Sequence, residues 1–348
     1  MEIFNVGIFV LGIISIVGGI LTLFIFLYSW LKSEPRRVQL LKFYFLPAYR
    51  DPEFSAYENE IEKIKSKRRV FRRFLNPLTI IGFFMILFIV ILAVYGPWLT
   101  DIELQYVLPP EIMGPKFQPP SPEHPLGTTL SGFDVYARII WGARTTISMA
   151  FIPVIIAMGG GLILGTISAY FGGTVDYIMM RFVDLMYSFP MLILIIIIGP
   201  LIGQDLLTTL LIYGVLGIPY NIRFMRSLVL QVKQMNYVRA AKTDGALKFK
   251  VMFKHIVPNA ISPVIITFFG GAAGTILGLA GLAFLGFGDP SAVTWGIDVN
   301  WARERYLTAL WATIWPGIFI GITAIGFMLI GDGIRDALDP RLHIQKKG

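Results

Sequence analysis

Long runs of apolar residues, separated by stretches rich in charge, proline and glycine, set the pattern along this chain. A bilayer core about 30 Å thick requires roughly 20 apolar residues in an α-helix. By this measure the pattern predicts seven transmembrane helices, at about 5–31, 78–98, 146–171, 184–203, 205–221, 263–287 and 308–331. Pro200, Gly203 and Gln204 interrupt the run from 184 to 221, which is long enough for two short crossings. The predicted fold class is therefore all-α, a polytopic membrane helix bundle.

The first apolar run is predicted to stay in the protein as an extra N-terminal transmembrane helix, residues 1–31. It begins with Met1-Glu2 and so lacks the positive start of a signal peptide. It is also too long for one, and no small-residue cleavage site follows it. We interpret it as an anchor or as a contact for a partner.

The composition agrees with a membrane protein. Of the 348 residues, 55% are hydrophobic and 15% are charged, and the mean hydropathy is +0.68. Soluble domains average about 45–50% apolar and about 25% charged residues. A soluble enzyme is thereby disfavoured, and the apolar runs indicate one membrane domain rather than several soluble ones.

Lys and Arg are concentrated on one side of the predicted bundle. Twelve lie in 32–73, eight in 222–255 and four in the tail after 331, whereas the loops of the opposite side carry five in total. Cytoplasmic loops are the ones rich in Lys and Arg, so the N-terminus is expected outside and the C-terminus in the cytoplasm of a cell-membrane protein. The basic linker 32–77 is interpreted as an anchor beside anionic lipid rather than as a nucleic-acid site.

Several kinds of chemistry are missing from the sequence. There is no P-loop for ATP and no Gly-Lys dipeptide. There is no cysteine, and the three histidines, His124, His255 and His343, lie far apart. Ion-coupled transporters usually keep carboxylates at mid-membrane, but none is predicted there. We therefore expect no catalytic, cofactor or metal site, and a partner must supply the energy for any uphill transport.

The basic segment 222–262, between two predicted spans, is the most informative stretch. Helix formers dominate from 233 to 256, and Ala240, Ala241 and Gly245 are predicted to share one small, flat helix face. Glycine inside a helix is unfavourable by about 1 kcal/mol relative to alanine, so Gly245 indicates either a break between two short helices or a close backbone approach. Pro258 is expected where the chain re-enters the membrane. Composition alone leaves open a solvated basic loop and a docking element.

This pattern resembles the EAA loop of ABC-transporter permeases, a Glu-Ala-Ala followed by a glycine and a later Ile/Leu-x-Pro. In that family the loop supplies the coupling helix that sits in a cleft of the ATPase subunit. Arg239 stands where the glutamate is usual. The resemblance implies an ATPase-coupling set of Arg239, Ala240, Ala241, Asp244, Gly245, Ile256 and Pro258.

Four further segments are similar to the C-type subunit of the dipeptide/oligopeptide permeases. Thr129, Phe133 and Leu279 depart from the residues usual in that family. The segments are His-Pro-Leu-Gly-Thr at 124–128 with Gly132, Asp134, Arg138 and Gly-Ala-Arg at 142–144; Arg-Phe-Val-Asp at 181–184 up to Pro190; Phe-Leu-Gly-Phe-Gly at 284–288 with Trp-Gly at 295–296; and 331–341, which ends in Asp-Pro-Arg.

The resemblance implies a type I ABC-importer permease fold, with six core helices plus the extra one. It places the first core helix and an extracellular loop at 78–144, the permease core at 145–335 and a cytoplasmic tail at 336–348. The implied partners are a homologous second permease subunit, two ABC ATPase subunits, an extracellular solute-binding protein and the lipid bilayer, with no nucleic acid. The helix around 237–252 is expected to move as a rigid lever during alternating access.

Two sets of small residues are candidates for close helix packing. Gly161 and Gly165 are interpreted as plain packing, and Gly270, Gly274 and Gly278 as packing or as part of a pore-lining subunit interface. Di- or oligopeptides are the substrates that the resemblance favours, with oligosaccharides or a metal complex as alternatives. A stand-alone channel or secondary carrier, and a membrane enzyme or scaffold, are the competing classes.

Overall fold

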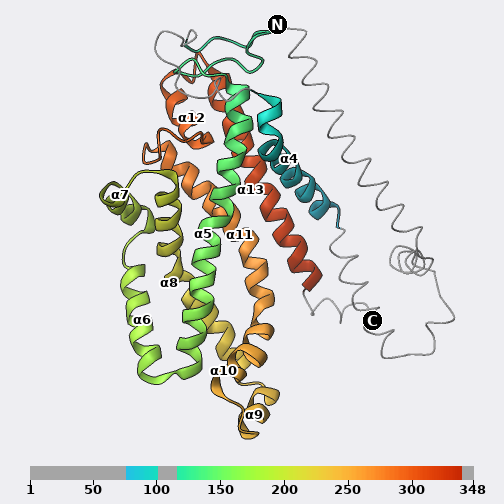
Figure 1. Ribbon diagram of the computed structural model, residues 1–348, viewed down its shortest axis with the longest axis vertical. Coiled ribbons are helices and arrows are strands. Elements are labelled where there is room, and N and C mark those ends of the chain that lie inside the picture. Colours follow the sequence, from blue (N-terminus) through green and yellow to red (C-terminus); the bar gives the residue numbers. More distant parts are fainter. Residues whose placement is uncertain (1–75, 101–115, 339–348) are drawn as a thin grey trace, which may run out of the picture.

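The computed structural model describes residues 76–100 and 116–338, and these form a bundle of helices with no strand in the described ranges (Figure 1). The predicted helix 5–31, the linker up to 75 and the tail after 338 lie outside the described residues. The elements are α4 (Pro77–Leu99), α5 (Val135–Phe171), α6 (Gly173–Tyr187), α7 (Met191–Ile202), α8 (Leu206–Lys233), α9 (Asn236–Thr243), α10 (Lys248–Val251), the π-helix η3 (Met252–Ile256), α11 (Val257–Phe284), α12 (Trp295–Ala302), the short η4 (Arg303–Arg305) and α13 (Leu310–Leu338).

Five helical segments are long and apolar enough to cross a membrane. They are Pro77–Leu99, Val135–Phe171, Leu206–Lys233, Lys248–Phe284 and Leu310–Leu338. The pair α6 and α7 passes the same test together, but the two helices are bent by 86° at their junction. The described part therefore holds up to six spans, in agreement with the six predicted core helices.

The prediction of two short crossings at 184–203 and 205–221 was wrong in its boundaries. In this region the structure has the α6–α7 pair, bent by 86°, and then α8, which continues to Lys233. The bend falls at 188–190, where Pro190 caps α7. The residue before a proline is biased away from the helical conformation, and here α6 ends at Tyr187, before Pro190.

Helix α5 is the central element and packs along α8 through glycines (Figure 1). A Cβ on Gly161 would lie 2.2 Å from the Cβ of Asn221, and one on Gly165 would lie 2.6 Å from the carbonyl oxygen of Ile222. Both glycines are thus needed for the backbones to approach. This confirms the interpretation of Gly161 and Gly165 as packing residues.

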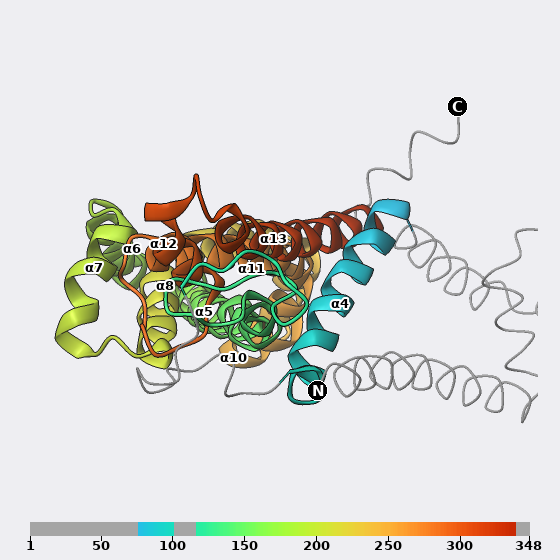
Figure 2. The same ribbon diagram turned by 90° about the horizontal axis from the view of Figure 1, so that it is seen from above.

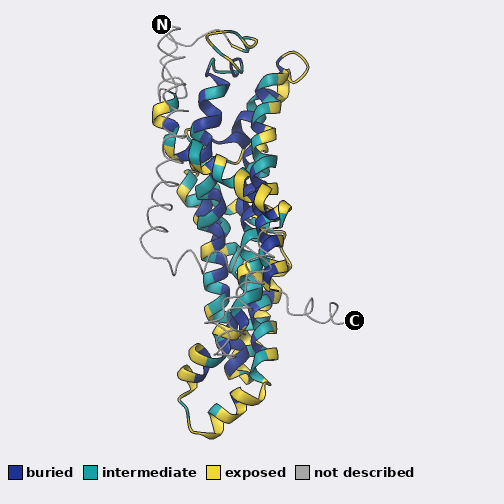
Figure 3. Ribbon diagram, turned by 90° about the vertical axis from the view of Figure 1, so that its right-hand side faces the viewer, coloured by how far each residue is buried: buried dark blue, intermediate teal, exposed yellow. Residues whose placement is uncertain are grey.

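Helices α4 and α7 lie at opposite ends of the bundle when it is seen from above (Figure 2). Helix α4 packs on α13, where Gly82 contacts Gly326 and Leu329, and where Thr79 lies against Gly333. Buried residues run through the middle of the bundle, and exposed residues gather at the end that carries α9 (Figure 3). We refer to this end as the α9 end and to the opposite one as the α12 end.

Substitution of the packing glycines tests this arrangement. Gly161→Ala is expected to destabilise the protein by about 1–3 kcal/mol, since the added methyl group overpacks the α5–α8 contact. Thermal unfolding of the purified protein in detergent measures the change. Gly274→Ala is the matched control, because a Cβ there meets nothing within 4 Å. Equal unfolding temperatures for the two variants would contradict the packing.

Candidate coupling site at the α9 end

The segment between α8 and α11 folds into two short helices joined by a tight turn. Helix α9 ends at Thr243, and Gly245 follows with φ +76°. L-residues rarely adopt this left-handed conformation, whereas glycine does so freely. A Cβ on Gly245 would meet nothing within 4 Å. Of the two predicted roles for Gly245, the structure therefore supports the break between helices and not a close backbone approach.

The rigid lever predicted over 237–252 is thus two helices, and the segment is shorter than the predicted 222–262. Only residues 234–247 lie between the end of α8 and the start of α10, and α9 fills most of this stretch. From Lys248 the chain is helical through η3 into α11. Pro258 lies in the first turn of α11 and has no amide hydrogen to donate. The π-helix η3, at Met252–Ile256, directly precedes α11. In it the backbone hydrogen bonds span five residues and not four.

One face of this segment is buried against the ends of α5 and α8. Val238, Val251, Met252 and Ile256 are fully buried, in one apolar cluster with Ala169 and other residues of the bundle. Ala241 and Ala246 pack against the same cluster. The coupling segment, residues 236–256, is therefore fixed to the bundle by its own apolar core.

Lys233, the last residue of α8, reinforces this attachment. Its ammonium group donates hydrogen bonds to the carbonyl oxygens of Ala169 (2.9 Å) and Tyr170 (2.8 Å). These carbonyls belong to the last turn of α5, where helical carbonyls lack partners and a positive charge is favourable. The ring of Tyr170 also lies 5.3 Å from the Nζ of Lys242 in α9. The end of α5 is thus held to both α8 and α9.

The opposite face of the coupling segment is exposed. On α10 and η3 the exposed apolar side chains are Leu247, Phe249 and Phe253, of which 76%, 63% and 58% of the surface is accessible. On α9, Arg239 and Ala240 are exposed, as are Asp244 and Gly245 beyond it. Exposed aromatic and aliphatic residues grouped in this way are typical of a docking surface.

The predicted site residues divide between the two faces. Arg239, Ala240, Asp244 and Gly245 are exposed, and so is Pro258. Ile256 is buried, and Ala241 packs inward. The prediction of one flat face formed by Ala240, Ala241 and Gly245 was therefore wrong, because consecutive helical residues point about 100° apart and Gly245 lies beyond the end of α9.

Sequence reasoning missed the residues that receive the coupling segment. Tyr170 lies at the end of the predicted span 146–171, and Lys233 was one of the eight Lys and Arg residues of the predicted basic segment, with nothing to single it out. The one available signal was the aromatic pair Tyr170-Phe171 directly before Gly172-Gly173. Both glycines have positive φ, so the chain turns there from α5 into α6.

Two ion pairs fasten α6 to α8 near the same end. Arg226 contacts the two carboxylate oxygens of Asp176 at 2.6 Å each, and Ser168 of α5 donates to the same carboxylate at 2.6 Å. Arg223 pairs with Asp184 and lies over the ring of Tyr187. Asp176, Arg181 and Asp184 all belong to α6, the helix that these ion pairs hold to α8.

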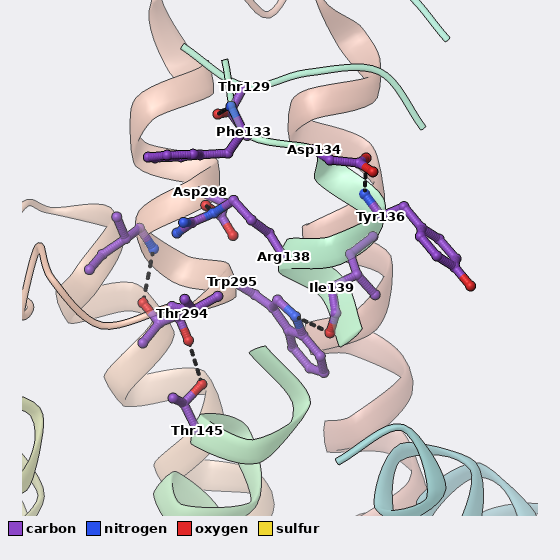
Figure 4. A network of polar contacts seen from close by, with 12 residues as sticks. Thr129, Phe133, Asp134, Tyr136, Arg138, Ile139, Thr145, Thr294, Trp295 and Asp298 are labelled. Atoms are coloured by element: carbon purple, nitrogen blue, oxygen red, sulfur yellow. Dashed lines mark hydrogen bonds and ion pairs between the residues drawn. The ribbon is translucent and has the colours of Figure 1, made fainter. Parts of the chain in front are cut away.

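The α12 end is closed by a buried ion pair. Arg138 of α5 and Asp298 of α12 lie together in Figure 4 and form a hydrogen-bonded ion pair. The guanidinium also lies 5.2 Å from the ring centre of Phe133 and 5.0 Å from that of Trp301. Burial raises the pKa of Asp298, and the charge of Arg138 opposes this rise. The predicted external motif around Arg138 is thus part of a folded cap.

His124 lies beside the start of α5 in the same cap. Its Nδ1 is 3.9 Å from the Oδ2 of Asp134, which caps α5 by accepting a hydrogen bond from the Tyr136 amide at 2.9 Å. Burial raises the pKa of Asp134, while the Tyr136 amide and His124 act against the shift. The His-Pro-Leu-Gly-Thr segment therefore serves to position the N-terminus of α5.

The candidate interface glycines on α11 have different surroundings. Gly278 lies against Tyr213 of α8, whose hydroxyl oxygen would be 2.2 Å from an added Cβ. A Cβ on Gly270 or on Gly274 would meet no described atom within 4 Å. Gly278 is thus a packing residue within the chain, and Gly270 and Gly274 are open for another contact.

Comparison with known proteins agrees with this architecture. Residues 161–344, which include the coupling segment, match the family described as binding-protein-dependent transport system inner membrane component. The chain belongs to this family. Residues 67–120, which include α4, match the N-terminal TM domain of oligopeptide transport permease C. The chain is a multi-pass membrane protein and a transport permease subunit with the type I ABC permease fold.

Relatives of this permease resemble it over most of its length. The dipeptide transport system permease protein DppC of Alkalihalophilus pseudofirmus is 32% identical over 294 residues, which are 84% of this chain and 95% of the relative. The probable D,D-dipeptide transport system permease protein DdpC of Escherichia coli is 35% identical over 268 residues, 76% of this chain and 88% of the relative. The glutathione transport system permease protein GsiD of Pectobacterium atrosepticum is 31% identical over 278 residues, 79% and 91% of the two chains.

Removal of one partner of the buried ion pair should destabilise the permease. Arg138→Met is expected to lower the free energy of unfolding by about 3–5 kcal/mol, since the Asp298 carboxylate then stays buried without its cation. Chemical unfolding in mixed micelles measures the loss. The loss should shrink as the pH falls, because protonated Asp298 carries no charge.

The double variant Arg138→Met with Asp298→Leu is the control for this experiment. It removes both charges and should recover most of the lost stability. A double variant as unstable as Arg138→Met alone would contradict the role of the pair.

The left-handed turn at Gly245 gives a second prediction. Gly245→Val should destabilise the turn by about 1–2 kcal/mol, because φ +76° forces a β-branched residue into a strained conformation. Limited proteolysis of the coupling segment should then become faster. Gly245→Asn, which tolerates this conformation, should be cleaved at nearly the rate of the wild type; equal rates for all three proteins would argue against strain.

Proposed function

We propose that this chain is the membrane-spanning permease subunit of an ABC importer for di- or oligopeptides. It forms half of the translocation path, and a homologous second permease subunit forms the other half. Two ABC ATPase subunits hydrolyse ATP, and an extracellular solute-binding protein delivers the solute. The names of the relatives, which refer to dipeptides, peptides and glutathione, support the substrate class.

The observation that carries this proposal is the two-faced coupling segment. Its inner face is packed into the apolar cluster around Val238 and held to α5 through Lys233 and Tyr170. Its outer face exposes Ala240 and Leu247, and Phe249 is 63% exposed although its ring lies 6.5 Å from that of Phe171 at the end of α5. A segment fixed on one side and open on the other is suited to pass motion from a docked subunit to the bundle.

The mechanism we infer is alternating access driven by the ATPase subunits. When ATP closes the nucleotide-binding dimer, the ATPase subunits move the coupling segment that sits in their clefts. The hydrogen bonds of Lys233 pass this movement to the end of α5, and the ion pairs of Asp176 and Asp184 carry α6 along with α8. The spans swing and open the path outward, and hydrolysis returns them.

The orientation follows from the same proposal. The α9 end faces the cytoplasm, where ATP is available, and the α12 end faces the solute-binding protein. The Lys and Arg content of the coupling segment supports this orientation. The open glycines Gly270 and Gly274 are proposed to lie at the interface with the second permease subunit.

Cross-linking tests the docking, and the absence of cysteine in the chain makes it direct. Single-cysteine variants at Ala240 and at Leu247 should cross-link to the ATPase subunits in the assembled transporter. A cysteine at Leu307, which is 81% exposed near the α12 end, is the control and should not. Equal cross-linking at all three positions, or none at Ala240 and Leu247, would refute the docking.

Transport assays test coupling and substrate. In proteoliposomes with all partners, Gly245→Val and Ala241→Leu should each lower ATP-driven peptide uptake at least about tenfold, because they distort or overpack the coupling segment, while the bundle stays folded. Full uptake with normal ATPase recruitment would refute the role of the segment. The solute that stimulates ATP hydrolysis identifies the substrate class. Stimulation by an oligosaccharide or a metal complex, and not by a peptide, would contradict the proposed substrate.

A further inference from the structure

The coupling segment carries far more positive than negative charge. Between 236 and 256 there are five Lys and Arg residues, Arg239, Lys242, Lys248, Lys250 and Lys254, and one acidic residue, Asp244. The resemblance to the EAA loop leads one to expect a glutamate at 239, so the charge at that position is the opposite of the usual one. The consequences depend on where these side chains lie.

Two of the lysines are engaged with the bundle. The Nζ of Lys242 lies 5.3 Å from the ring centre of Tyr170, and that of Lys248 lies 6.0 Å from the ring centre of Phe171. Both rings belong to the end of α5. A cation over an aromatic face is stabilised there, so these two lysines help to hold the segment to its own chain.

Arg239 and Lys250 are oriented differently. Val238 and Ala241 form the inward side of α9. Because consecutive residues of an α-helix point about 100° apart, Arg239, Ala240 and Thr243 lie on the outward side. The Thr243 hydroxyl donates to the Ala240 carbonyl at 2.8 Å and so does not project toward a partner. Within residues 76–100 and 116–338, Arg239 and Lys250 form no ion pair. Their charges are open to a docked protein.

Apolar residues next to these charges would exclude water in a docked complex. Leu247 precedes Lys250 by one helical turn, and Phe249 and Phe253 are exposed on the same stretch. A cationic side chain that loses its water without gaining an anion is strongly unfavourable. A partner that covers this face and removes water from the two cations is therefore expected to offer them carboxylates.

Anionic lipid headgroups are a poor match for these two cations. On α8 the first charged residue toward the α9 end is Arg223. From there α8 continues for ten residues to Lys233, and these ten residues span about 15 Å along the helix axis. The headgroup layer on each side of a bilayer is only about 5–8 Å thick. Helix α9 begins after Lys233 and projects beyond the other helices (Figure 1), so it lies past the headgroups.

We propose that the coupling segment is built for an ATPase cleft lined with carboxylates, one for Arg239 and one for Lys250. This inference rests on the proposed function and adds to it the chemistry of the partner surface. The guanidinium of Arg239 matches a carboxylate in a bidentate pair, beside the small surface of Ala240. Leu247 and Phe249 fill the apolar part of the cleft.

Charge reversal in the assembled permease pair tests this. The two permease subunits are placed in nanodiscs of neutral phosphatidylcholine, and the binding of their native ATPase subunits is measured at about 50 mM and about 500 mM NaCl. Wild-type binding should weaken at the higher salt concentration. Arg239→Glu and Lys250→Glu should each weaken binding about tenfold at low salt, and Arg239→Gln should fall between. Arg305→Glu, exposed near the α12 end, carries the same change in net charge and should bind as the wild type does.

The outcomes separate this inference from the proposed function. If the wild type binds the ATPase and Arg239→Glu binds equally well or more tightly, the carboxylate cleft is refuted while the docking stands. If Arg239→Glu weakens binding only in nanodiscs with anionic phosphatidylglycerol, the cations serve lipid headgroups and the inference is also refuted. If the wild type binds no ATPase and the cysteine at Ala240 does not cross-link, the proposed function itself fails. Restored binding of Arg239→Glu to an ATPase with one cleft carboxylate changed to lysine would establish the pair.

Discussion

The close approach of α5 and α8 is the contact on which the rest of the structure depends. It requires glycine at 161 and 165, because any side chain there would collide with Asn221 or with the backbone of α8. In lipid there is little hydrophobic gain from bringing two apolar helices together, so close packing supplies the attraction. Once the two helices are in register, their ends at the α9 end fall side by side.

That register brings Lys233 to the last carbonyls of α5 and Arg226 to Asp176 of α6. The coupling segment then closes over the same corner through Val238, Val251 and Ile256. At the α12 end, Arg138 and Asp298 fix α5 to α12. A polar contact thus anchors α5 at each end, while the middle is held by apolar and glycine packing. In the proposed mechanism, a push on the coupling segment would reach α5 while the contact at its far end stays in place.

The turn at Gly245 gives the segment its shape. A single continuous helix would place Val238 and Met252 about 21 Å apart along its axis, so the buried residues of α9 and η3 would not meet in one compact cluster. The break lets Val238 and Met252 both reach the bundle, while Arg239, Leu247 and Lys250 remain exposed. A conformation available to glycine at little cost therefore decides which residues are offered to a partner.

The sequence by itself determined the class of protein and the long apolar core helices, because long apolar runs follow from the lipid in which those segments lie. It also indicated the packing at Gly161, and it offered the break as one of two roles for Gly245. Only the tertiary structure decided the bend between α6 and α7, the inward side of Ala241, and the pairing of Lys233 with the end of α5. The inward side of Ala241 and the pairing of Lys233 depend on residues tens of positions apart meeting in space, and a local pattern carries no information on which distant backbone a side chain will reach. For the bend, Pro190 marks the break, but the sequence does not give its angle.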